Sequence, residues 1–303
     1  MGWNPRNLPT QQGKTFVVTG ANAGLGYFTS EQLASTGAHV ILACRNDTRA
    51  QNAAARIRER VPGASVSTML LDVADLRSVA AAGERIRSLA RLDGLILNAG
   101  IVHPPTDRSV SLDGNELVFA TNYLGHAALA LAVLPALERT PDSRVVSLGS
   151  LISILMDSAL DDLQLETTYS GWKAYAQSKI AAQVLGFELD RRLRARGASV
   201  RSLVAHPGYS ISGLTPGIAG VNEVDGKKRV IDGLQRLIGA QGKHQGAYPV
   251  VRAALDASLP SGSYVGPRFL MRGGPVRQPA TRTSRDAGVA ALLWERTQAL
   301  LDA

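Results

Sequence analysis

Tyr175 and Lys179 are the residues whose types and spacing first suggest chemistry. They lie four residues apart in a segment with helical spacing, so both side chains should share one face of a helix. A neighbouring ammonium favours tyrosinate, so we expect Lys179 to lower the phenol pKa from about 10 towards the working range. Tyr175 could then give a proton to a carbonyl oxygen or take one from an alcohol. Taken alone, such a pair could also be an incidental surface pair.

A glycine-rich stretch near the N-terminus could hold phosphate groups. It directly follows an apolar strand pattern and opens a helical pattern. Gly20 permits a tight turn, Gly24 lets the backbone approach a pyrophosphate, and Gly26 lets helix and strand pack closely. The N-terminus of the helix adds unpaired N–H groups that favour an anion. The candidate cofactor-binding residues of this stretch are Gly20, Asn22, Ala23, Gly24, Leu25 and Gly26.

The elements that must position these residues alternate along the chain. Apolar, β-branched runs predict strands at 15–19, 38–43, 65–71, 92–97, 143–148 and 199–205. Helical spacing falls between them, at 25–35, 48–61, 76–89, 122–137 and 172–195. Strands that are continuously apolar and alternate with helices indicate a parallel sheet covered on both faces. The sequence therefore predicts an α/β fold with a single doubly wound parallel sheet.

The last third of the chain departs from this alternation. Residues 208–244 are rich in glycine and show helical spacing only at 227–238, which is typical of a lid or binding loop. Further elements are predicted as a helix at 247–255, a short final strand at 264–265 and a helix at 286–301. We expect one domain over residues 1–303, with a core at 14–266, a substrate loop at 209–244 and a C-terminal extension at 277–303.

Apolar residues of the substrate loop could form the walls of a pocket, as small-molecule sites usually have. They are Leu214, Ile218, Val221, Val224, Val230, Ile231, Leu234 and Leu237. This composition suggests a lipophilic or aromatic ketone, aldehyde or alcohol as substrate. The same residues could instead simply pack a lid.

Composition and charge exclude several classes of protein. The 303 residues are 45% hydrophobic, enough for a sizeable core, and the single Cys44 excludes an intramolecular disulfide or a Cys-based zinc site. The His residues lack metal-ligand spacing, so no metal is predicted. The net charge of +8 comes from scattered Arg residues, which does not suggest nucleic acid as a partner. The polar N-terminus and the short apolar run at 127–136 suggest a soluble, cytoplasmic protein without a membrane span.

Three motifs, in the right order, resemble those of the short-chain dehydrogenase/reductase family. Thr19 to Gly26 matches TGxxxGxG, Asn98-Ala99-Gly100 matches the NAG motif, and Tyr175 to Lys179 matches YxxxK. The resemblance covers residues 14–266 and is greatest to the retinol dehydrogenase and protochlorophyllide reductase branch. The segments that carry this likeness are Ala43-Cys44-Arg45, Asn122 to His126 and His206-Pro207-Gly208. The resemblance implies a Rossmann fold and an oxidoreductase acting on C=O or CH–OH groups.

The resemblance also completes a catalytic set around Tyr175 and Lys179. Ser150 follows a predicted strand at the C-terminal edge of the sheet, where ligands bind in open α/β folds, and it matches the active-site Ser of the family. The preceding residue, Gly149, departs from the usual Ser. Asn122 matches an Asn that holds a water for proton relay, or it could cap a helix. The predicted catalytic residues are Asn122, Ser150, Tyr175 and Lys179.

The end of the second predicted strand indicates which dinucleotide is bound. An acidic residue there would bind the ribose 2′-OH of NAD, but the position is Cys44, and Arg45 follows it. A guanidinium suits a phosphate, and Arg49 could reinforce it, so NADP(H) is favoured over NAD. The alternative is that Arg45 is merely a solvated loop residue.

The family pattern places further residues around the cofactor. By this resemblance Asp72 and Val73 contact the adenine ring, although Asp72 could also cap the next helix. Asn98-Ala99-Gly100 would form the floor under the nicotinamide ribose, although an Asn and a Gly at a strand end are also ordinary turn residues. His206 alone is more often structural than catalytic. The remaining cofactor-binding residues implied by the family are Pro207, Gly208 and Ser212, with Tyr175 and Lys179.

These features together favour an NADP-dependent oxidoreductase that moves a hydride between nicotinamide and a carbonyl or alcohol, with Tyr175 as general acid/base. The alternative is a non-catalytic NADP-binding regulatory protein, which would be expected to have a damaged catalytic set. A nucleic-acid-binding protein driven by the +8 charge is the third interpretation. The family commonly forms dimers or tetramers, and the helix at 172–195 is the candidate surface for a homodimer or homotetramer.

Overall fold

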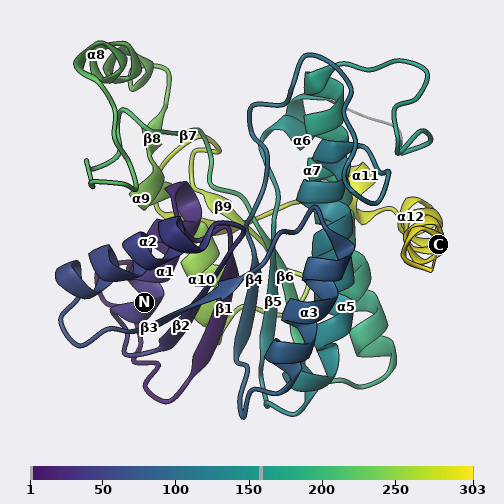
Figure 1. Cartoon of the computed structure of the whole chain (residues 1–303), viewed down its shortest axis with the longest axis horizontal. Helices are drawn as coiled ribbons and strands as arrows, with labels where there is room; N and C mark the ends of the chain where they lie inside the picture. Colours follow the sequence, from purple (N-terminus) through teal and green to yellow (C-terminus); the bar gives the residue numbers. More distant parts are fainter. Residues whose placement is uncertain (1–2, 157–159, 303) are drawn as a thin grey trace.

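One mostly parallel sheet forms the centre of the fold (Figure 1). A computed structural model describes residues 3–156 and 160–302, so Met1 and Gly2 of the polar N-terminus lie outside the described residues. Within those ranges the sheet has eight strands, in the order β10-β9-β6-β5-β4-β1-β2-β3. They are β1 (Thr15–Thr19), β2 (His39–Cys44), β3 (Ser65–Leu70), β4 (Gly94–Leu97), β5 (Arg144–Leu148), β6 (Arg201–Ala205), β9 (Tyr264–Pro267) and β10 (Pro275–Gln278). Because β2 and β3 lie on one side of β1 and β4 to β6 on the other, the predicted doubly wound α/β fold is confirmed.

Helices cover both faces of this sheet (Figure 1). One face carries α1 (Gly24–Ala34), α2 (Asp47–Arg60) and α10 (Tyr248–Leu255). The other carries α3 (Leu76–Arg87), α5 (Gly125–Glu138) and α7 (Gly171–Ala195). Every residue of β4 and β5 is buried. Covering on both faces explains why these strands are mostly apolar rather than alternating, although β5 also buries Arg144 and Ser147.

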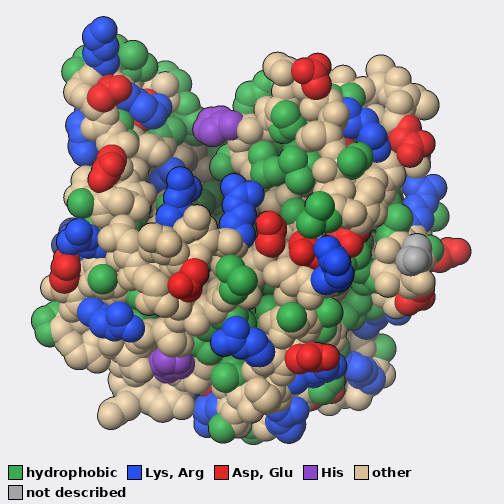
Figure 2. Space-filling view, in the orientation of Figure 1, with side chains coloured by type: hydrophobic (Ala, Val, Ile, Leu, Met, Phe, Trp, Pro, Cys, Tyr) green, Lys and Arg blue, Asp and Glu red, His purple; other side chains and the backbone are tan. Residues whose placement is uncertain are grey.

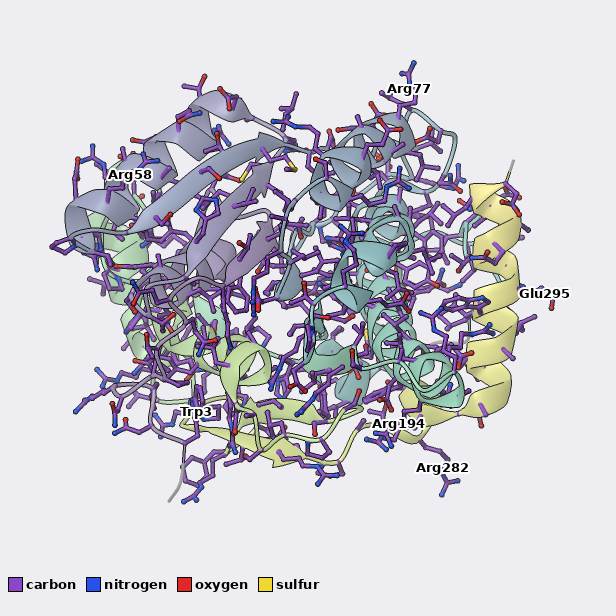
Figure 3. All side chains as sticks on the ribbon, turned by 90° about the horizontal axis from the view of Figure 1, so that it is seen from below. Trp3, Arg58, Arg77, Arg194, Arg282 and Glu295 are labelled. Carbon is purple, nitrogen blue, oxygen red and sulfur yellow. The ribbon has the colours of Figure 1, made fainter. Side chains whose placement is uncertain are left out.

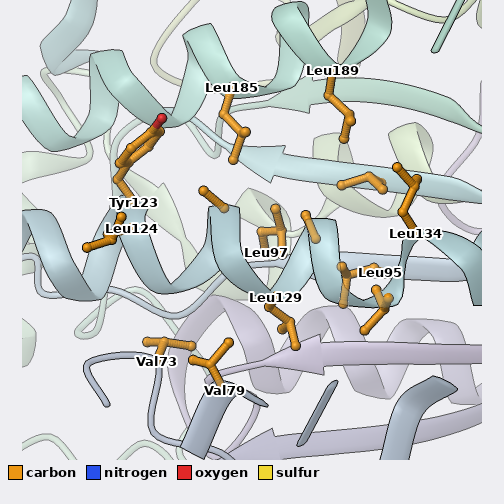
Figure 4. Packing of buried hydrophobic residues seen from close by; sticks show 14 of the residues in the cluster. Val73, Val79, Leu95, Leu97, Tyr123, Leu124, Leu129, Leu134, Leu185 and Leu189 are labelled. Carbon is orange, nitrogen blue, oxygen red and sulfur yellow. The ribbon is translucent and has the colours of Figure 1, made fainter. Parts of the chain in front are cut away.

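The core on the α5 and α7 side holds α7 against the sheet. Figure 4 shows Leu95 and Leu97 of β4 in one cluster with Leu129 of α5 and Leu185 of α7. All four side chains are buried. Because interiors are close-packed, this contact fixes the position of α7 and of Tyr175, which it carries.

The helix predicted at 122–137 starts earlier than the sequence indicates. It begins with α4 (Leu117–Phe119), passes through a π-helical turn, η1 (Ala120–Leu124), and continues as α5. Glu116 caps it, since its carboxylate accepts hydrogen bonds of 2.9 and 2.7 Å from two N–H groups of the first turn. The polar cap and the π-helical turn interrupt the regular spacing on which the prediction rested.

The apolar segment of this helix is also longer than the run at 127–136. Leu117–Glu138 is long and apolar enough, by length and composition, to cross a membrane. However, 78% of its most apolar window is buried inside the fold. Such burial is that of a core helix.

The C-terminal part adds elements that the sequence did not indicate. The predicted last strand, β9, is followed by β10, which pairs with it in antiparallel register at the sheet edge. Pro275 at the start of β10 and the polar Arg277 and Gln278 hide this strand from an apolar pattern. A short α11 (Arg282–Arg285) leads into α12 (Ala287–Leu301), which the sequence predicted at 286–301.

The helix α12 covers part of α7 (Figure 3). The hydroxyls of Tyr123 and Thr297 lie 2.6 Å apart, and the Arg192 guanidinium lies 4.1 Å from the centre of the Trp294 ring. In Figure 3, Glu295 points from α12 away from the fold. The face of α7 under α12 is therefore covered within the chain. Only the rest of α7 could form the predicted contact with another subunit.

The substrate loop forms a lobe at the C-terminal edge of the sheet. It contains β7 (Ser210–Ile211), α8 (Gly226–Gln235), β8 (Gln241–Gly242) and α9 (Lys243–Gly246), with β7 and β8 paired. Figure 1 shows α8 at the tip of this lobe and α6 (Ile152–Leu155) on the opposite side of the same edge. Figure 2 shows the surface hollowed between the two, with hydrophobic side chains on both sides.

Candidate active site

Tyr175, Lys179 and Ser150 come together at the C-terminal edge of the sheet. Ser170 begins α7 by accepting a hydrogen bond on its side chain, so Tyr175 and Lys179 both lie on this helix. Ser150 follows the end of β5. The Tyr175 hydroxyl donates to Ser150 Oγ at 3.3 Å, and Lys179 Nζ donates to the carbonyl oxygen of Leu148 at 3.4 Å. The fold thus brings two predicted hydroxyls and an ammonium to one place.

Burial sets the charge of these groups. It raises the pKa of Tyr175, and the hydrogen bond with Ser150 offsets this only in part. Burial also lowers the pKa of Lys179 to about 8. The expectation that Lys179 lowers the phenol pKa is therefore wrong for the chain alone, because desolvation of the phenol dominates. The phenol is protonated at neutral pH, which is the state that can donate a proton.

Asn122 lies within η1 and links a loop to α7. Its Oδ1 accepts from Ile101 N at 2.7 Å, and its Nδ2 donates to Ile101 O at 3.1 Å and to Ser178 Oγ at 2.9 Å. The alternative that Asn122 caps a helix is wrong, since it lies inside one. A Cβ atom on Gly100 would lie 2.9 Å from Asn122 Oδ1 and 3.5 Å from Lys179 Nζ. Both side chains therefore flank this glycine.

The glycine stretch makes a close turn between β1 and α1. Gly20 has φ +64°, and a Cβ atom there would lie 2.8 Å from Ala99 Cα. Gly24 also has a positive φ, of +59°. A Cβ atom on Gly26 would collide with the side chain of Asn98 and the carbonyl of Gly20. Glycine is thus required both by the turn and by the contact with the NAG segment.

The N-terminus of α1 can bind an anion. Its N-cap residue, Ala23, makes no side-chain cap, and the first turn contains no acidic residue. In contrast, Asn46, Asp75 and Ser170 cap α2, α3 and α7. Unsatisfied N–H groups and the positive end of the helix dipole attract phosphate, so the loop fits the pyrophosphate of a dinucleotide. In this loop Asn22 and Leu25 are half-buried and Ala23 is exposed.

The NAG segment is bound to β1 by hydrogen bonds, so its Asn does more than form an ordinary turn. Asn98 Nδ2 donates to the carbonyl oxygen of Thr19 at 2.7 Å, and the Thr19 hydroxyl accepts from the N–H groups of Asn98 and Ala99 at 2.9 Å each. Thr19 Oγ1 also lies 2.9 Å from Nε2 of His126. Burial lowers the pKa of His126 to about 4, so this ring is neutral. The network fixes the floor on which the glycine loop rests.

The end of β2 presents positive charge. Cys44 is buried, and the N–H groups of Ala21 and Asn22 donate to its sulfur. Burial raises the pKa of this thiol to about 11, so it is neutral. Arg45 and Arg49 are exposed, and neither guanidinium forms a hydrogen bond or ion pair with the residues that the structure describes. Both are available to an anionic group.

Asp72 and Val73 follow β3 at the same edge of the sheet. Asp72 Oδ1 accepts from Ala74 N at 2.9 Å. The alternative that Asp72 caps the next helix is wrong, because Asp75 caps α3 by accepting from two N–H groups of its first turn. Val73 is buried, and its carbonyl lies so close to Gly125 that a Cβ atom there would collide with it.

His206 makes the contacts of a structural residue. It is fully buried, and its Nε2 lies 2.8 Å from Gln278 Oε1 on β10. Its ring stacks on that of Tyr264, with the ring centres 5.2 Å apart. These contacts join β6 to the edge of the sheet.

The segment expected at the nicotinamide anchors the lobe. The carbonyl oxygen of Pro207 accepts from Gln241 Nε2 at 2.8 Å, and Gly208 turns the chain with φ +67°. Ser212 follows β7 and is half-buried. The lobe is thus hydrogen-bonded to the segment predicted to bind the cofactor.

Lys243 is a candidate that sequence spacing did not indicate. It begins α9, and its Nζ lies 3.6 Å from where a Cβ atom on Gly24 would be. The ammonium forms no hydrogen bond or ion pair within the described part of the chain. Burial, and to a lesser degree Lys228, lower its pKa, while Asp232 opposes this. Only the tertiary fold brings this cation to the glycine loop, so no local pattern could reveal it.

The predicted pocket-wall residues do not form one surface. Ile218 belongs to the buried core, and Val221 packs against that core. The other six are half-buried (Leu214, Val224) or exposed on or just after α8 (Val230, Ile231, Leu234, Leu237). Across the hollow, α6 exposes Ile154 and Leu155, which the sequence did not single out.

The glycine loop, the NAG segment and the Tyr175 and Lys179 pair occur together on a doubly wound sheet. The sequence model of the short chain dehydrogenase family matches residues 14–218. The chain therefore belongs to the short-chain dehydrogenase family, as its motifs suggested. This family implies NAD(H) or NADP(H) as the cofactor, and the glycine loop fits such a group.

Individual proteins of known function or structure are similar to this chain to different extents. Human retinol dehydrogenase 13 is 39% identical over 203 residues, which cover 66% of this chain and 60% of that protein. Polyprenol dehydrogenase from Danio rerio is 32% identical over 300 residues, covering 97% of this chain and 89% of that protein. The match thus spans less than two thirds of retinol dehydrogenase 13. A solved structure of an uncharacterized protein from Mycobacterium Paratuberculosis has a TM-score of 0.80 at 35% identity, covering 100% of this chain and 98% of that one.

Proposed function

We propose that this chain is an NADP(H)-dependent oxidoreductase that interconverts the carbonyl and alcohol forms of a lipophilic small molecule. The observation that carries the proposal is the pair of hydroxyls of Tyr175 and Ser150, 3.3 Å apart beside Lys179. They lie at the sheet edge that also carries the uncapped glycine loop. One oxygen atom of a substrate could accept hydrogen bonds from both hydroxyls.

The chain's own residues would manage the proton. When bound, the nicotinamide supplies a hydride to a carbonyl carbon or accepts one from an alcohol. The Tyr175 hydroxyl donates a proton to the carbonyl oxygen in reduction and takes it back in oxidation. The Ser150 hydroxyl holds this oxygen as negative charge develops on it. Burial raises the pKa of Tyr175, so the phenol is in the protonated form that can donate to a carbonyl oxygen.

Lys179 and Asn122 would restore the proton. The Lys179 ammonium, with a pKa lowered to about 8, can exchange protons near neutral pH and stabilise a transient tyrosinate. Asn122 lies beside the same glycine as Lys179 and is held by three hydrogen bonds. Its rigid position suits the water-holding role implied by the family.

Separate residues would recognise the parts of the cofactor. Arg45, with Arg49, would bind the 2′-phosphate, because an exposed guanidinium without a partner suits a phosphate. The glycine loop and Lys243 would hold the pyrophosphate. The adenine and nicotinamide ends would be held by Asp72, Val73, Asn98, Ala99, Gly100, Pro207, Gly208 and Ser212.

Two observations support a lipophilic substrate. The hollow at the active-site edge has hydrophobic side chains on both sides (Figure 2). On the α6 side of this edge, Ile154 and Leu155 are exposed. Two relatives are named for retinol and for polyprenol, which are long apolar alcohols. An apolar substrate would be sheltered in such a hollow.

Turnover of NADPH with a panel of carbonyl compounds tests the proposal. The panel holds retinal, a polyprenal, an aromatic ketone and a short polar aldehyde, each repeated with NADH. We expect the loss of NADPH absorbance to be fastest with the long apolar aldehydes and slower with NADH. Tight NADPH binding without turnover of any compound would instead favour the regulatory protein.

A further inference from the structure

The helix α8 and the turn after it carry an apolar stripe that faces solvent. Val230, Ile231 and Leu234 recur at helical spacing and share one side of α8, and Leu237 and Ile238 follow in the turn after it. Their exposed fractions are 69% for Val230, 58% for Ile231, 65% for Leu234, 84% for Leu237 and 65% for Ile238. A surface helix normally turns such a stripe towards the core.

Polar residues take the inward side of α8 instead. Asp232 is only 2% exposed, and its Oδ2 accepts from Gly213 N at 2.7 Å. The Tyr209 hydroxyl donates to Gln235 Oε1 at 2.5 Å. These bonds hold the helix to the lobe by its polar side. The outward position of the apolar stripe is therefore fixed by specific contacts.

A neighbouring turn extends the apolar area. Phe269 is 70% exposed and Leu270 is 49% exposed. The Arg272 guanidinium donates to the carbonyl oxygen of Arg236 at 3.3 Å, which joins this turn to the end of α8. We call the stripe together with Phe269 and Leu270 the α8 surface. Contiguous apolar areas of this kind mark interaction sites.

Basic residues surround the α8 surface. They are Lys227, Lys228, Arg229, Arg236, Arg268 and Arg272. Three acidic residues offset only part of this charge: Asp232 is buried and pairs with Lys228 at 3.3 Å, Asp225 caps the N-terminus of α8, and Glu223 is exposed just before it. Exposed apolar residues within a basic rim match a lipid surface that carries negative charge.

We propose that the α8 surface docks on an anionic lipid bilayer, lying in its interface without spanning it. A second copy of the chain fits less well, because a twofold contact through this surface would bring the basic rims of both copies together. Docking would place the hollow at the active-site edge next to the bilayer. The proposal goes beyond the proposed function, and its test needs neither cofactor nor substrate.

Co-sedimentation with vesicles tests the proposal. The probes are vesicles of phosphatidylcholine alone and of phosphatidylcholine with phosphatidylserine, each at low and high salt. We expect the whole chain to bind the mixed vesicles and to be released by salt. The double variant Leu234→Asp/Leu237→Asp should bind at least about tenfold more weakly, since it breaks the apolar face. Leu112→Asp is the matched control, because Leu112 is 78% exposed in a distant loop.

Charge variants separate the basic rim from the stripe. Arg229→Ala and Arg236→Ala should each weaken binding to mixed vesicles by roughly fivefold. The proposal is overturned if the wild-type chain ignores the mixed vesicles, binds both vesicle types equally, or keeps its binding in the double variant. The proposal is also overturned, in favour of self-association, if light scattering shows that the wild-type chain and Leu112→Asp are dimers whereas the double variant is a monomer.

Discussion

We call the glycine loop, the strands that support it and the site around Tyr175 the fixed region. The fixed region and the lobe around α8 meet at the same edge of the sheet, but they place their polar and apolar side chains differently. Around the loop, polar side chains such as Thr19, Asn98 and Asn122 are tied to backbone groups, and glycines are required by contact. In the lobe, α8 turns its polar side inward and its apolar side outward. A site for a ligand of fixed shape needs particular residues at particular positions, and these are recognisable as motifs in the sequence. A surface for a varied apolar partner needs only exposed apolar residues, so the sequence shows it only as an apolar composition.

Tyr175→Phe should produce the largest loss of activity. Such a loss would show that the reaction takes place in the fixed region and not in the lobe. Removing the proton donor should lower kcat by about a thousandfold, while the Kd for NADPH stays the same. Steady-state kinetics and fluorescence titration measure the two. Tyr169→Phe is the matched control, since its hydroxyl only donates to the carbonyl oxygen of Pro105. A variant that kept half of its turnover would remove Tyr175 from the reaction.

Gly20→Ala tests whether the loop is as tightly fitted as the contacts suggest. The new Cβ atom would lie 2.8 Å from Ala99 Cα, so the loop must shift and NADPH should bind about a hundredfold more weakly. Gly63→Ala separates strain from contact, since Gly63 has φ +78° with nothing within 4 Å of its Cβ position. It should cost about 1 kcal/mol of stability and leave the Kd for NADPH unchanged. Equal effects of both variants on that Kd would contradict a fitted loop.

His126 should make the fixed region sensitive to acid. Burial lowers its pKa from 6.5 to about 4, so the unfolded chain takes up the proton first as the pH falls. His126 therefore does not lower the free energy of unfolding above pH 6.5. Between pH 6.5 and pH 4 the free energy of unfolding should fall by about 3 kcal/mol because of this residue. Denaturant unfolding across this range should show a shallower slope for His126→Gln than for the wild type. His103→Gln, at an exposed position, should keep the slope; the reverse pattern would refute the assignment.

Arg45→Ala tests how the 2′-phosphate of NADP(H) is recognised. Losing a charge-assisted contact to the 2′-phosphate should weaken NADPH binding by about tenfold or more and leave NADH binding unchanged. Arg77→Ala, at an exposed position on α3, is the control. Isothermal titration with both dinucleotides decides the matter. An equal loss for NADH and NADPH would show that Arg45 does not select NADP(H).

Lys243→Met should have the smallest effect on cofactor binding. Lys243 is the residue of the lobe that lies next to the glycine loop. Because NADH and NADPH share the pyrophosphate, both should bind roughly fivefold more weakly. Lys227→Met on exposed α8 is the control for loss of a positive charge. The same titrations apply, and a loss confined to NADPH would assign Lys243 to the 2′-phosphate instead.

Much of the fixed region could be predicted from the sequence, because short segments determine it. The succession of strands along the chain, the turn at Gly20 and the spacing of Tyr175 and Lys179 are each visible in a short segment. Features that depend on burial and tertiary contact could not be predicted in this way. The direction of the Tyr175 pKa shift depends on desolvation, the position of Lys243 depends on a distant loop, and β10 forms only because β9 offers an edge. The outward stripe of α8 was visible as apolar spacing, but its direction was not.

The proposed function requires Tyr175 and Ser150 to hold one substrate oxygen over the reactive ring of NADP(H). A crystal structure of the chain with NADPH and an unreactive lipophilic alcohol tests it directly. The alcohol oxygen should lie within about 3.2 Å of both hydroxyls, with its carbon facing the nicotinamide and the 2′-phosphate on Arg45. A phenol turned away from the nicotinamide, with the alcohol bound elsewhere, would contradict the claim.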